Sequence, residues 1–541
     1  MASCEELPVE LKEAIILELS PRDLNNLSKT CKSLRVVALP AMFRRIEFTW
    51  DAKAADGPAI TALLRSILET PALGKNIKDL TLQAVNYRGF RAPGFNGDIL
   101  LPGHTHRIPA PDWEMFEKAL EACPCEEKGE CDDTTTREGN LNAGIAVLIS
   151  YCTRLESLQM DIQLLMNNYR LPAMLRSTLY RTLGPWGKQS WFEKLTQVTI
   201  TQGYGPLEKE ALFHVTEQYA TNLPVPTDTF LALFYLPAVK TLDITLFPNV
   251  DASEGLQKDS GRHTVWPFPQ APLALWLTTL RICRSPALPA TLDLLLQVTP
   301  NLTTLDYDLF TPASKAPICL DTLRQALERV RRTLKHLTIK LDVFGDDYGV
   351  DDDEFDTPAE DMGVVCRGAL GSLREFDALL TLKASLPALY GQVHAFDPSS
   401  LANILPPNLQ RLVITDDMWN FMAFLWTDIH LLRLLRKFIT GEKKHKEWWD
   451  QAARLPEISF IADTEPLWKT ATPHLSELVV DFERADGENE GFLLRPEQRN
   501  LFKKLCREQG ISCEILYYDV NKVLRKHLSS DVESSGVELL E

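Results

Sequence analysis

The stretch PNLTTLDYDLF at residues 300–310 contains the pattern that decides the fold of most of the chain. Its second half alternates apolar residues with Asp306 and Asp308, and this period of two is typical of a β-strand with one buried face. We therefore expect a short strand here, entered through a turn.

The same pattern recurs on both sides of this stretch. Each copy places an apolar residue two positions before a leucine-like residue and then alternates apolar and polar side chains. A strand is predicted in each copy. The copies are IKDLTLQAV (77–85), TRLESLQMDI (153–162), EKLTQVTITQ (193–202), PAVKTLDITLF (237–247), LWLTTLRICRS (275–285), RTLKHLTIKLDVF (332–344), PNLQRLVITDD (407–417) and PHLSELVVDFE (473–483).

Segments with helical periodicity lie between these strands. Strands and helices that alternate in this way predict a parallel array of one-strand, one-helix units. The helical segments are GPAITALLRSILETP (57–71), NAGIAVLISYC (142–152), TDTFLALFYLP (227–237), ATLDLLLQVTP (290–300), CLDTLRQALERVRR (319–332) and EQRNLFKKLCREQG (497–510).

This alternation resembles degenerate leucine-rich repeats. It departs from regular ones because the Asn or Cys that usually closes the turn is mostly absent and the spacing is uneven. The resemblance implies an α/β fold, with an irregular solenoid of parallel strands and helices over residues 49–526. An ordinary doubly wound α/β domain is the alternative, although the chain contains no glycine-rich phosphate loop of the kind such domains often carry.

In a solenoid the strands line one concave surface, where outward side chains meet a partner. If Leu242 and Ile244 point inward, the residues that alternate with them point outward. Acids predominate on this inferred face, so we expect it to bind a basic segment of a substrate protein. The outward residues are Asp243, Thr245, Asp306, Asp308, Lys340, Asp342, Val479 and Asp481, of which Asp243, Asp306, Asp308 and Asp342 are the expected substrate-binding residues.

The chain begins differently, with LPVELKEAIILELSPRDLNNLSKTCKSLRVVALPAMFRRIEF at residues 7–48. The spacing predicts three short helices, the second capped by Ser20 with Pro21 and Asp23 in its first turn, and the third ending near Pro40. Leaving a Leu or Ile in water forgoes roughly 1.5–3 kcal/mol of burial, and so short a domain cannot cover them all. Either the following domain or another protein must cover them.

This stretch resembles an F-box: it has the Leu-Pro opening, the Glu-Leu after it, paired isoleucines, a Leu-Ser-Pro-x-Asp-Leu turn and a Cys-Lys at the third helix. The resemblance implies that the cover is the Skp adaptor of Skp–cullin–F-box ubiquitin ligases. It departs at Leu34, where many F-boxes have Trp. PAMFRRIEFTW is similar to a segment of fungal F-box proteins. The implied adaptor contacts are Leu7, Pro8, Leu11, Ile15, Ile16, Leu19, Leu24 and Leu27.

The resemblance implies a substrate-receptor subunit that holds the adaptor, and through it a cullin, at one end and a target protein at the other. The alternative is a scaffold that binds Skp without a ligase role, or helices that only cap their own repeats. An α/β enzyme is a third reading. It is disfavoured because no GxSxG, HExxH or interpretable Cys/His pair occurs. We expect no catalysis and no cofactor.

The composition of the chain limits the classes of partner that we expect. The net charge of −17 argues against nucleic acid. The acidic start resembles no secretory signal, and no apolar run is long enough to span a bilayer, so a soluble protein of the cytoplasm, the nucleus or both is expected. The eleven cysteines are expected to be reduced.

Three stretches interrupt the array: loops near 86–138 and 345–362, and a polar acidic tail at 527–541. In the first loop, Cys123, Cys125 and Cys131 with His104 and His106 make a zinc site conceivable, but their spacing fits no standard zinc motif, so a plain loop and no metal are expected. The helical domain is expected over 1–48.

Overall fold

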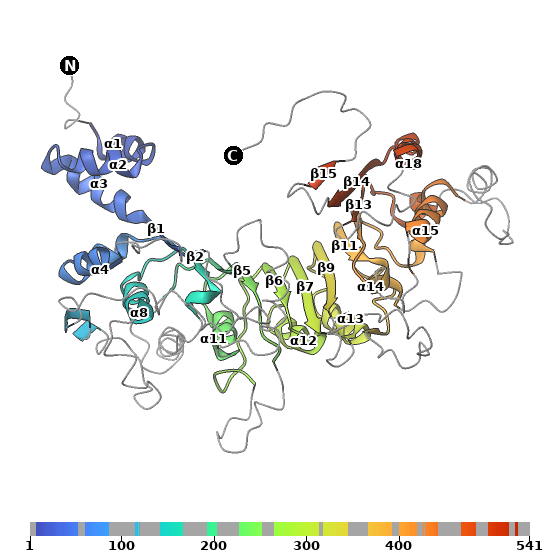
Figure 1. Ribbon diagram of the computed structural model, residues 1–541, viewed down its shortest axis with the longest axis horizontal. Coiled ribbons are helices and arrows are strands. Elements are labelled where there is room, and N and C mark those ends of the chain that lie inside the picture. The colour runs from blue at the N-terminus through green and yellow to red at the C-terminus, as the bar shows by residue number, and fades with distance from the viewer. Residues whose placement is uncertain are drawn as a thin grey trace, which may run out of the picture. The chain divides into compact units, whose positions relative to one another are not determined.

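A computed structural model gives the arrangement of the chain (Figure 1). The chain divides into two compact units, Met1–Leu280 and Arg281–Glu541. The structure describes residues 7–51, 60–85, 114–116, 118–119, 141–165, 192–202, 225, 227–250, 265–312, 318–344, 366–391, 400–418, 426, 428–441, 467–482, 496–518 and 525–527.

The first unit combines helices with a parallel sheet. Its strands pair in the order β1-β2-β3-β4-β5, and every one of these pairs is parallel. The strands are β1 (Arg45–Asp51), β2 (Asp79–Val85), β3 (Ser157–Asp161), β4 (Gln197–Thr201) and β5 (Thr241–Thr245), and β6 (Thr279–Ser285) begins in this unit. The helices that follow β1 are α4 (Ile60–Glu69), η2 (Gly74–Asn76), α8 (Leu141–Tyr151), η3 (Ile162–Leu164), α11 (Thr227–Ala232) and η4 (Leu233–Tyr235).

The second unit contains a large sheet in the order β7-β9-β11-β12-β13-β14-β15. All neighbours are parallel except β14 and β15, which are antiparallel. The strands are β7 (Thr304–Pro312), β9 (His336–Phe344), β11 (Thr381–Ser385), β12 (Arg411–Thr415), β13 (Glu477–Phe482), β14 (Ser512–Tyr518) and β15 (Arg525–His527), with a separate pair of β8 (Ile318–Cys319) and β10 (Cys366–Arg367). The helices are α12 (Pro289–Gln297), α13 (Leu320–Glu328), α14 (Leu386–Tyr390), η6 (Leu401–Asn403), α15 (Asp428–Thr440), α17 (Leu467–Ala471) and α18 (Pro496–Glu508).

The strands bury equivalent positions, which is why the recurring sequence pattern forms them. In β3, Leu158 and Met160 are both 2% exposed, and Leu155 is fully buried in the turn before the strand. In β7, Leu305 is fully buried, and so is Leu302 in the turn before it. Each side chain of this kind contributes roughly 1.5–3 kcal/mol by leaving water, so the repeated positions supply the core of both units.

A backbone contact also repeats at the entry to the strands. The carbonyl of Lys78 accepts hydrogen bonds from the amides of Glu156 and Ser157, at 2.7 and 3.0 Å. The contact joins each turn to the next one along the sheet and so keeps consecutive strands in register. Carbonyls that accept two amides in this way belong to Lys78, Glu156, Thr196, Lys240, Thr303, Lys335, Leu380 and Gln410.

The predicted strands and helices are confirmed: every quoted stretch contains a strand, and every quoted helical segment contains a helix. The doubly wound alternative is wrong, because the strand order in each unit follows the chain instead of reversing. Sequence reasoning missed β1, β8, β10, β11, β14 and β15. In β11 the second inward position holds Ala384 where most other copies have a larger residue, and this weakened the pattern.

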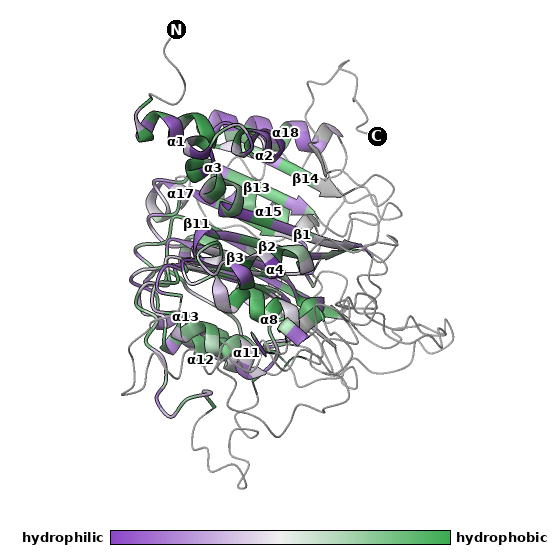
Figure 2. Cartoon of the chain, turned by 90° about the vertical axis from the view of Figure 1, so that its left-hand side faces the viewer, coloured by the Kyte–Doolittle hydropathy of each residue, from purple (hydrophilic) through white to green (hydrophobic). Residues whose placement is uncertain are grey.

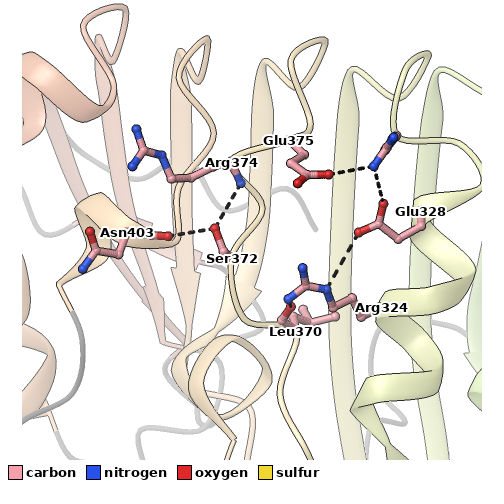
Figure 3. Close-up of polar contacts among 8 residues, drawn as sticks. Arg324, Glu328, Leu370, Ser372, Arg374, Glu375 and Asn403 are labelled. Atoms are coloured by element: carbon pink, nitrogen blue, oxygen red, sulfur yellow. Dashed lines mark hydrogen bonds and ion pairs between the residues drawn. The ribbon is translucent and has the colours of Figure 1, made fainter.

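Polar contacts on the surface of the second unit join α13 to the next repeat (Figure 3). Arg324 Nη1 donates to the carbonyl of Leu370 at 3.2 Å. Arg331 Nη1 donates to Glu328 at 3.1 Å and to Glu375 at 2.7 Å. Because Glu375 is mostly exposed, these ion pairs add little stability, and the apolar core carries most of it.

Gly391, which caps the C-terminal end of α14, is a sensitive backbone position. Its φ angle is +71°, and a Cβ atom there would press against the carbonyl oxygen of Gly368. We expect Gly391→Ala to lower the free energy of unfolding by about 1–3 kcal/mol in a denaturant titration. Gly510→Ala is the matched control, because its φ is +80° but nothing lies within 4 Å. If the two variants lose equal stability, the steric contact at Gly391 contributes nothing.

Candidate functional site

Three short helices open the first unit, as the sequence predicts. They are α1 (Val9–Leu17), α2 (Pro21–Ser28) and α3 (Lys32–Arg44), and both α1 and α2 contact α3. α3 leads directly into β1, and the Arg44 carbonyl at its end accepts a hydrogen bond from the Lys78 amide at 2.9 Å. The C-terminal end of α3 therefore connects these helices to the sheet.

The predicted cap of the second helix is confirmed. The amide of Asp23 donates to Ser20 Oγ at 3.2 Å, and Ser20 Oγ donates to Asp23 Oδ2 at 2.6 Å. Asp23 also places a negative charge in the first helical turn, where the helix dipole favours it. Cys31 caps α3 in a similar way, because its Sγ accepts from the Leu34 amide at 3.5 Å.

The predicted end of the third helix near Pro40 is wrong, because α3 continues to Arg44. Proline inside a helix removes one backbone hydrogen bond and usually breaks the helix. Here the residues that follow it, Ala41 and Met42, pack on the core of the helical domain. This packing holds the last turn of α3 in place.

The helical domain has a small core of its own. Ile16 is 3% exposed, Leu24 is 6% exposed and Ala38 is fully buried, so each helix contributes one side chain. Leu34 is also buried, at 8% exposed. The partly buried residues around this core are Leu19, Leu27, Val37, Ala41 and Met42.

α1 also exposes three apolar side chains, and we name Val9, Leu11 and Ile15 the N-terminal ridge. Their exposed fractions are 55%, 52% and 46%. Leu11 and Ile15 are four residues apart and so lie on one face of the helix. In Figure 2, α1 carries both the green of hydrophobic residues and the purple of hydrophilic ones. On α3, Val36 is 71% exposed. The folded chain therefore leaves the ridge in water.

The structure divides the predicted adaptor contacts into two groups. Ile16 and Leu24 lie in the domain's own core, so burial makes them structural residues instead of contact residues. The spacing of apolar residues alone did not show which side of α1 is buried. Lys12, which is only 8% exposed, lies on that buried side. Val9 and Val36 were missed. The accessible or partly accessible members of the predicted set are Leu7, Pro8, Leu11, Ile15, Leu19 and Leu27.

The departure from the F-box pattern at Leu34 falls inside the domain. Leu34 is 8% exposed, whereas the ridge residues Leu11 and Ile15 are about half exposed. This departure from the F-box pattern therefore lies among the buried residues and not on the ridge.

The polar face of the strands is the second predicted surface, and two of its acids, Asp306 and Asp308, lie near bases. Asp243, Asp306, Asp308 and Asp342 are all half-buried on the expected face. Asp306 Oδ2 accepts from Arg281 Nε at 2.9 Å. Burial raises the pKa of the Asp308 carboxyl, while the positive charges of Lys340 and Arg284 oppose this rise. These acids thus do not form a free negative surface.

Val479 and Asp481 lie on the expected face, because the register aligns Val479 with Val413 and Lys383, but neither side chain is exposed. Both side chains are buried, at 1% and 2% exposed, so this part of the face is covered. Asp481 Oδ2 accepts from Lys383 Nζ at 2.8 Å, across β12. The expected preference for basic substrates stays a prediction.

Metal and membrane sites find no support in the part of the chain that the structure describes. There, no group of three His, Cys, Asp or Glu side chains could hold a metal ion. The zinc candidates at 104–131 lie outside the described residues. Among the described helices, none has the length and apolar character needed to cross a bilayer.

The comparisons with known proteins address the N-terminal helices. Residues 4–49 match the protein-family model described as F-box-like. No curated protein matches the chain. The matched residues contain α1, α2 and α3, and F-box domains generally bind the Skp adaptor. The N-terminal helices therefore form an F-box-like domain, which supports the assignment of the chain as an F-box protein.

Proposed function

We propose that the chain is a substrate-receptor subunit of a Skp–cullin–F-box ubiquitin ligase. The observation that carries this proposal is the N-terminal ridge, in which Leu11 and Ile15 are 52% and 46% exposed on an F-box-like domain. Covering the exposed part of these side chains by a partner is favourable in proportion to the apolar area removed from water. The Skp adaptor is the partner that F-box domains generally bind.

The repeats serve as the part that holds a target protein. We infer that they form an irregular leucine-rich-repeat-like solenoid, an inference supported by the recurring buried positions and by the paired amides at the strand entries. The segment PAMFRRIEFTW at 40–50 supports a fungal type of F-box protein. The protein acts in the cytoplasm or the nucleus.

The proposed mechanism is positioning, without bond chemistry or a cofactor in this chain. One end holds the adaptor and the cullin, and the other holds the target, so the target's lysines reach a ubiquitin-charged enzyme at high effective concentration. The alternative is a scaffold without a ligase role. Such a scaffold binds Skp but not the cullin.

Reconstitution tests the proposal. We expect the full-length chain, mixed with purified Skp adaptor and cullin, to elute from size-exclusion chromatography as one complex containing all three proteins. A complex with Skp alone would instead support the scaffold. Elution of the chain separately from Skp would contradict both roles.

A further inference from the structure

The turn before β6 in the first unit exposes three large apolar side chains. Leu273, Leu275 and Trp276 are 66%, 47% and 64% exposed. Single exposed apolar residues are common on protein surfaces, but a contiguous group marks an interaction site. We name these three residues the Trp276 patch.

The equivalent positions in the other repeats show that the fold does not require this patch. Each repeat has a buried apolar residue three positions before the first buried residue of its strand. In the repeat of β6 that residue is Leu277. The position just before it holds Trp276 in this repeat. In the others it holds Asn76, Arg154, Lys194, Ala238, Asn301, Thr333, Ala378, Asn408 and His474, which are all polar or small. Leu275 likewise stands where the other repeats have proline or a polar residue.

Side-chain contacts fix the position of the segment that carries the patch. Phe268 packs edge-on against Tyr235, with ring centroids 4.7 Å apart. Tyr235 Oη donates to the carbonyl of Gln270 at 2.5 Å. Pro272 and Ala274 are buried, and they alternate with the exposed Leu273 and Leu275.

Backbone bonds fix the turn as well. The amide of Leu275 donates to the Leu273 carbonyl at 2.9 Å, and the amide of Leu277 donates to the Ala274 carbonyl at 3.2 Å. A patch that is already ordered loses little conformational entropy when a partner covers it.

The charge next to the patch indicates the chemistry of the partner. The amide of Thr278 donates to the Lys240 carbonyl at 2.9 Å, which fixes the neighbouring turn beside the patch. The Lys240 side chain is exposed. Positive side chains at the rim of an apolar patch favour a partner with acidic residues beside its apolar ones.

We propose that the Trp276 patch and Lys240 bind a segment of a partner protein in which aromatic or aliphatic residues stand next to Asp or Glu. Trp is enriched among the residues that dominate binding energy, and Trp276 is 64% exposed here. A lipid surface fits less well, because the net charge of −17 disfavours approach to anionic membranes. This inference goes beyond the proposed function, because it does not depend on the adaptor.

Selection from a random peptide library displayed on phage, with the full-length chain as bait, tests the proposal. We expect the enriched peptides to carry apolar residues beside acids. Trp276→Ser should weaken the binding of a synthetic enriched peptide about tenfold or more in fluorescence anisotropy. Lys240→Glu should shift the selection toward basic peptides. Arg154→Ser, the equivalent position of another repeat, is the matched control and should bind normally.

Several results would overturn the proposal. The proposal is wrong if no peptide is enriched, if the natural chain enriches basic peptides, or if peptide binding survives Trp276→Ser. Sedimentation of the chain with phosphatidylserine vesicles that Trp276→Ser abolishes would assign the patch to membranes. Self-association lost in the same variant would assign it to a second copy. Since Trp276 is exposed, circular dichroism should show no change, and a variant with an altered N-terminal ridge should still bind the peptide.

Discussion

Replacing Leu11 and Ile15 together by aspartate is expected to abolish binding of the Skp adaptor while the chain stays folded. Both side chains are about half exposed on α1, so charged groups there remain in water and disturb no packing. Binding is lost because the partner would have to bury two unpaired carboxylates in an apolar contact. We expect at least a roughly hundredfold weakening, measured by isothermal titration with the purified adaptor.

Two control variants make this result specific. Glu13→Gln changes an exposed polar residue of the same helix and should leave adaptor affinity nearly unchanged. Ile16→Asp introduces a charge into the core of the helical domain, where Ile16 is 3% exposed, and should unfold that domain. Normal adaptor binding by the Leu11→Asp, Ile15→Asp variant would show that the N-terminal ridge is not the docking surface. Loss of the circular dichroism signal would show that these residues are structural.

Replacing Lys383 by methionine is expected to lower the free energy of unfolding of the second unit by about 3 kcal/mol. Lys383 Nζ lies 2.8 Å from Asp481 Oδ2, and the Asp481 side chain is only 2% exposed. The substitution removes the lysine and leaves a buried carboxylate without this counter-charge. Breaking a buried ion pair from one side costs more than the pair contributes, because the remaining charge is desolvated. A urea titration followed by circular dichroism measures the loss.

The double variant Lys383→Met with Asp481→Leu is the matched control for this prediction. It removes both charges together and should recover most of the stability lost in the single variant, since apolar replacements of a buried pair are often neutral. If the double variant is as unstable as Lys383→Met alone, the lost stability comes from packing of the lysine stem and not from the unpaired charge.

The two faces of α1 explain why the helical domain is both stable and available to a partner. Lys12 and Ile16 turn toward the domain, while Leu11 and Ile15, one residue earlier in each case, turn away from it. The core that α1 shares with α2 and α3 is complete without the N-terminal ridge. A partner can therefore cover the ridge without any refolding of the three helices.

Much of the fold could be predicted because it depends on local periodicity. The alternation around Leu305, and its copies, placed a strand correctly in every quoted stretch. The cap formed by Ser20 and Asp23 was predictable for the same reason, since all of its atoms lie within one turn of helix. The extent of α3 was not, because the packing of Ala41 and Met42 outweighs the effect of Pro40.

The candidate sites depended more on contacts between distant residues. The sequence placed Asp306 and Asp308 on the polar face but could not show that Arg281 pairs with Asp306. It also placed Asp481 on the polar face but could not show that this side chain is buried and pairs with Lys383, 98 positions away. The Trp276 patch became visible only when exposure was compared among the repeats.

The F-box-like start and the alternation of strands and helices could be predicted from the order of residues, because neighbouring residues encode those periods. The apolar side chains that stay in water, and the charges that pair, became known from the folded structure. Burial and ion pairing depend on which parts of the chain meet in space, and no local pattern of residues specifies that.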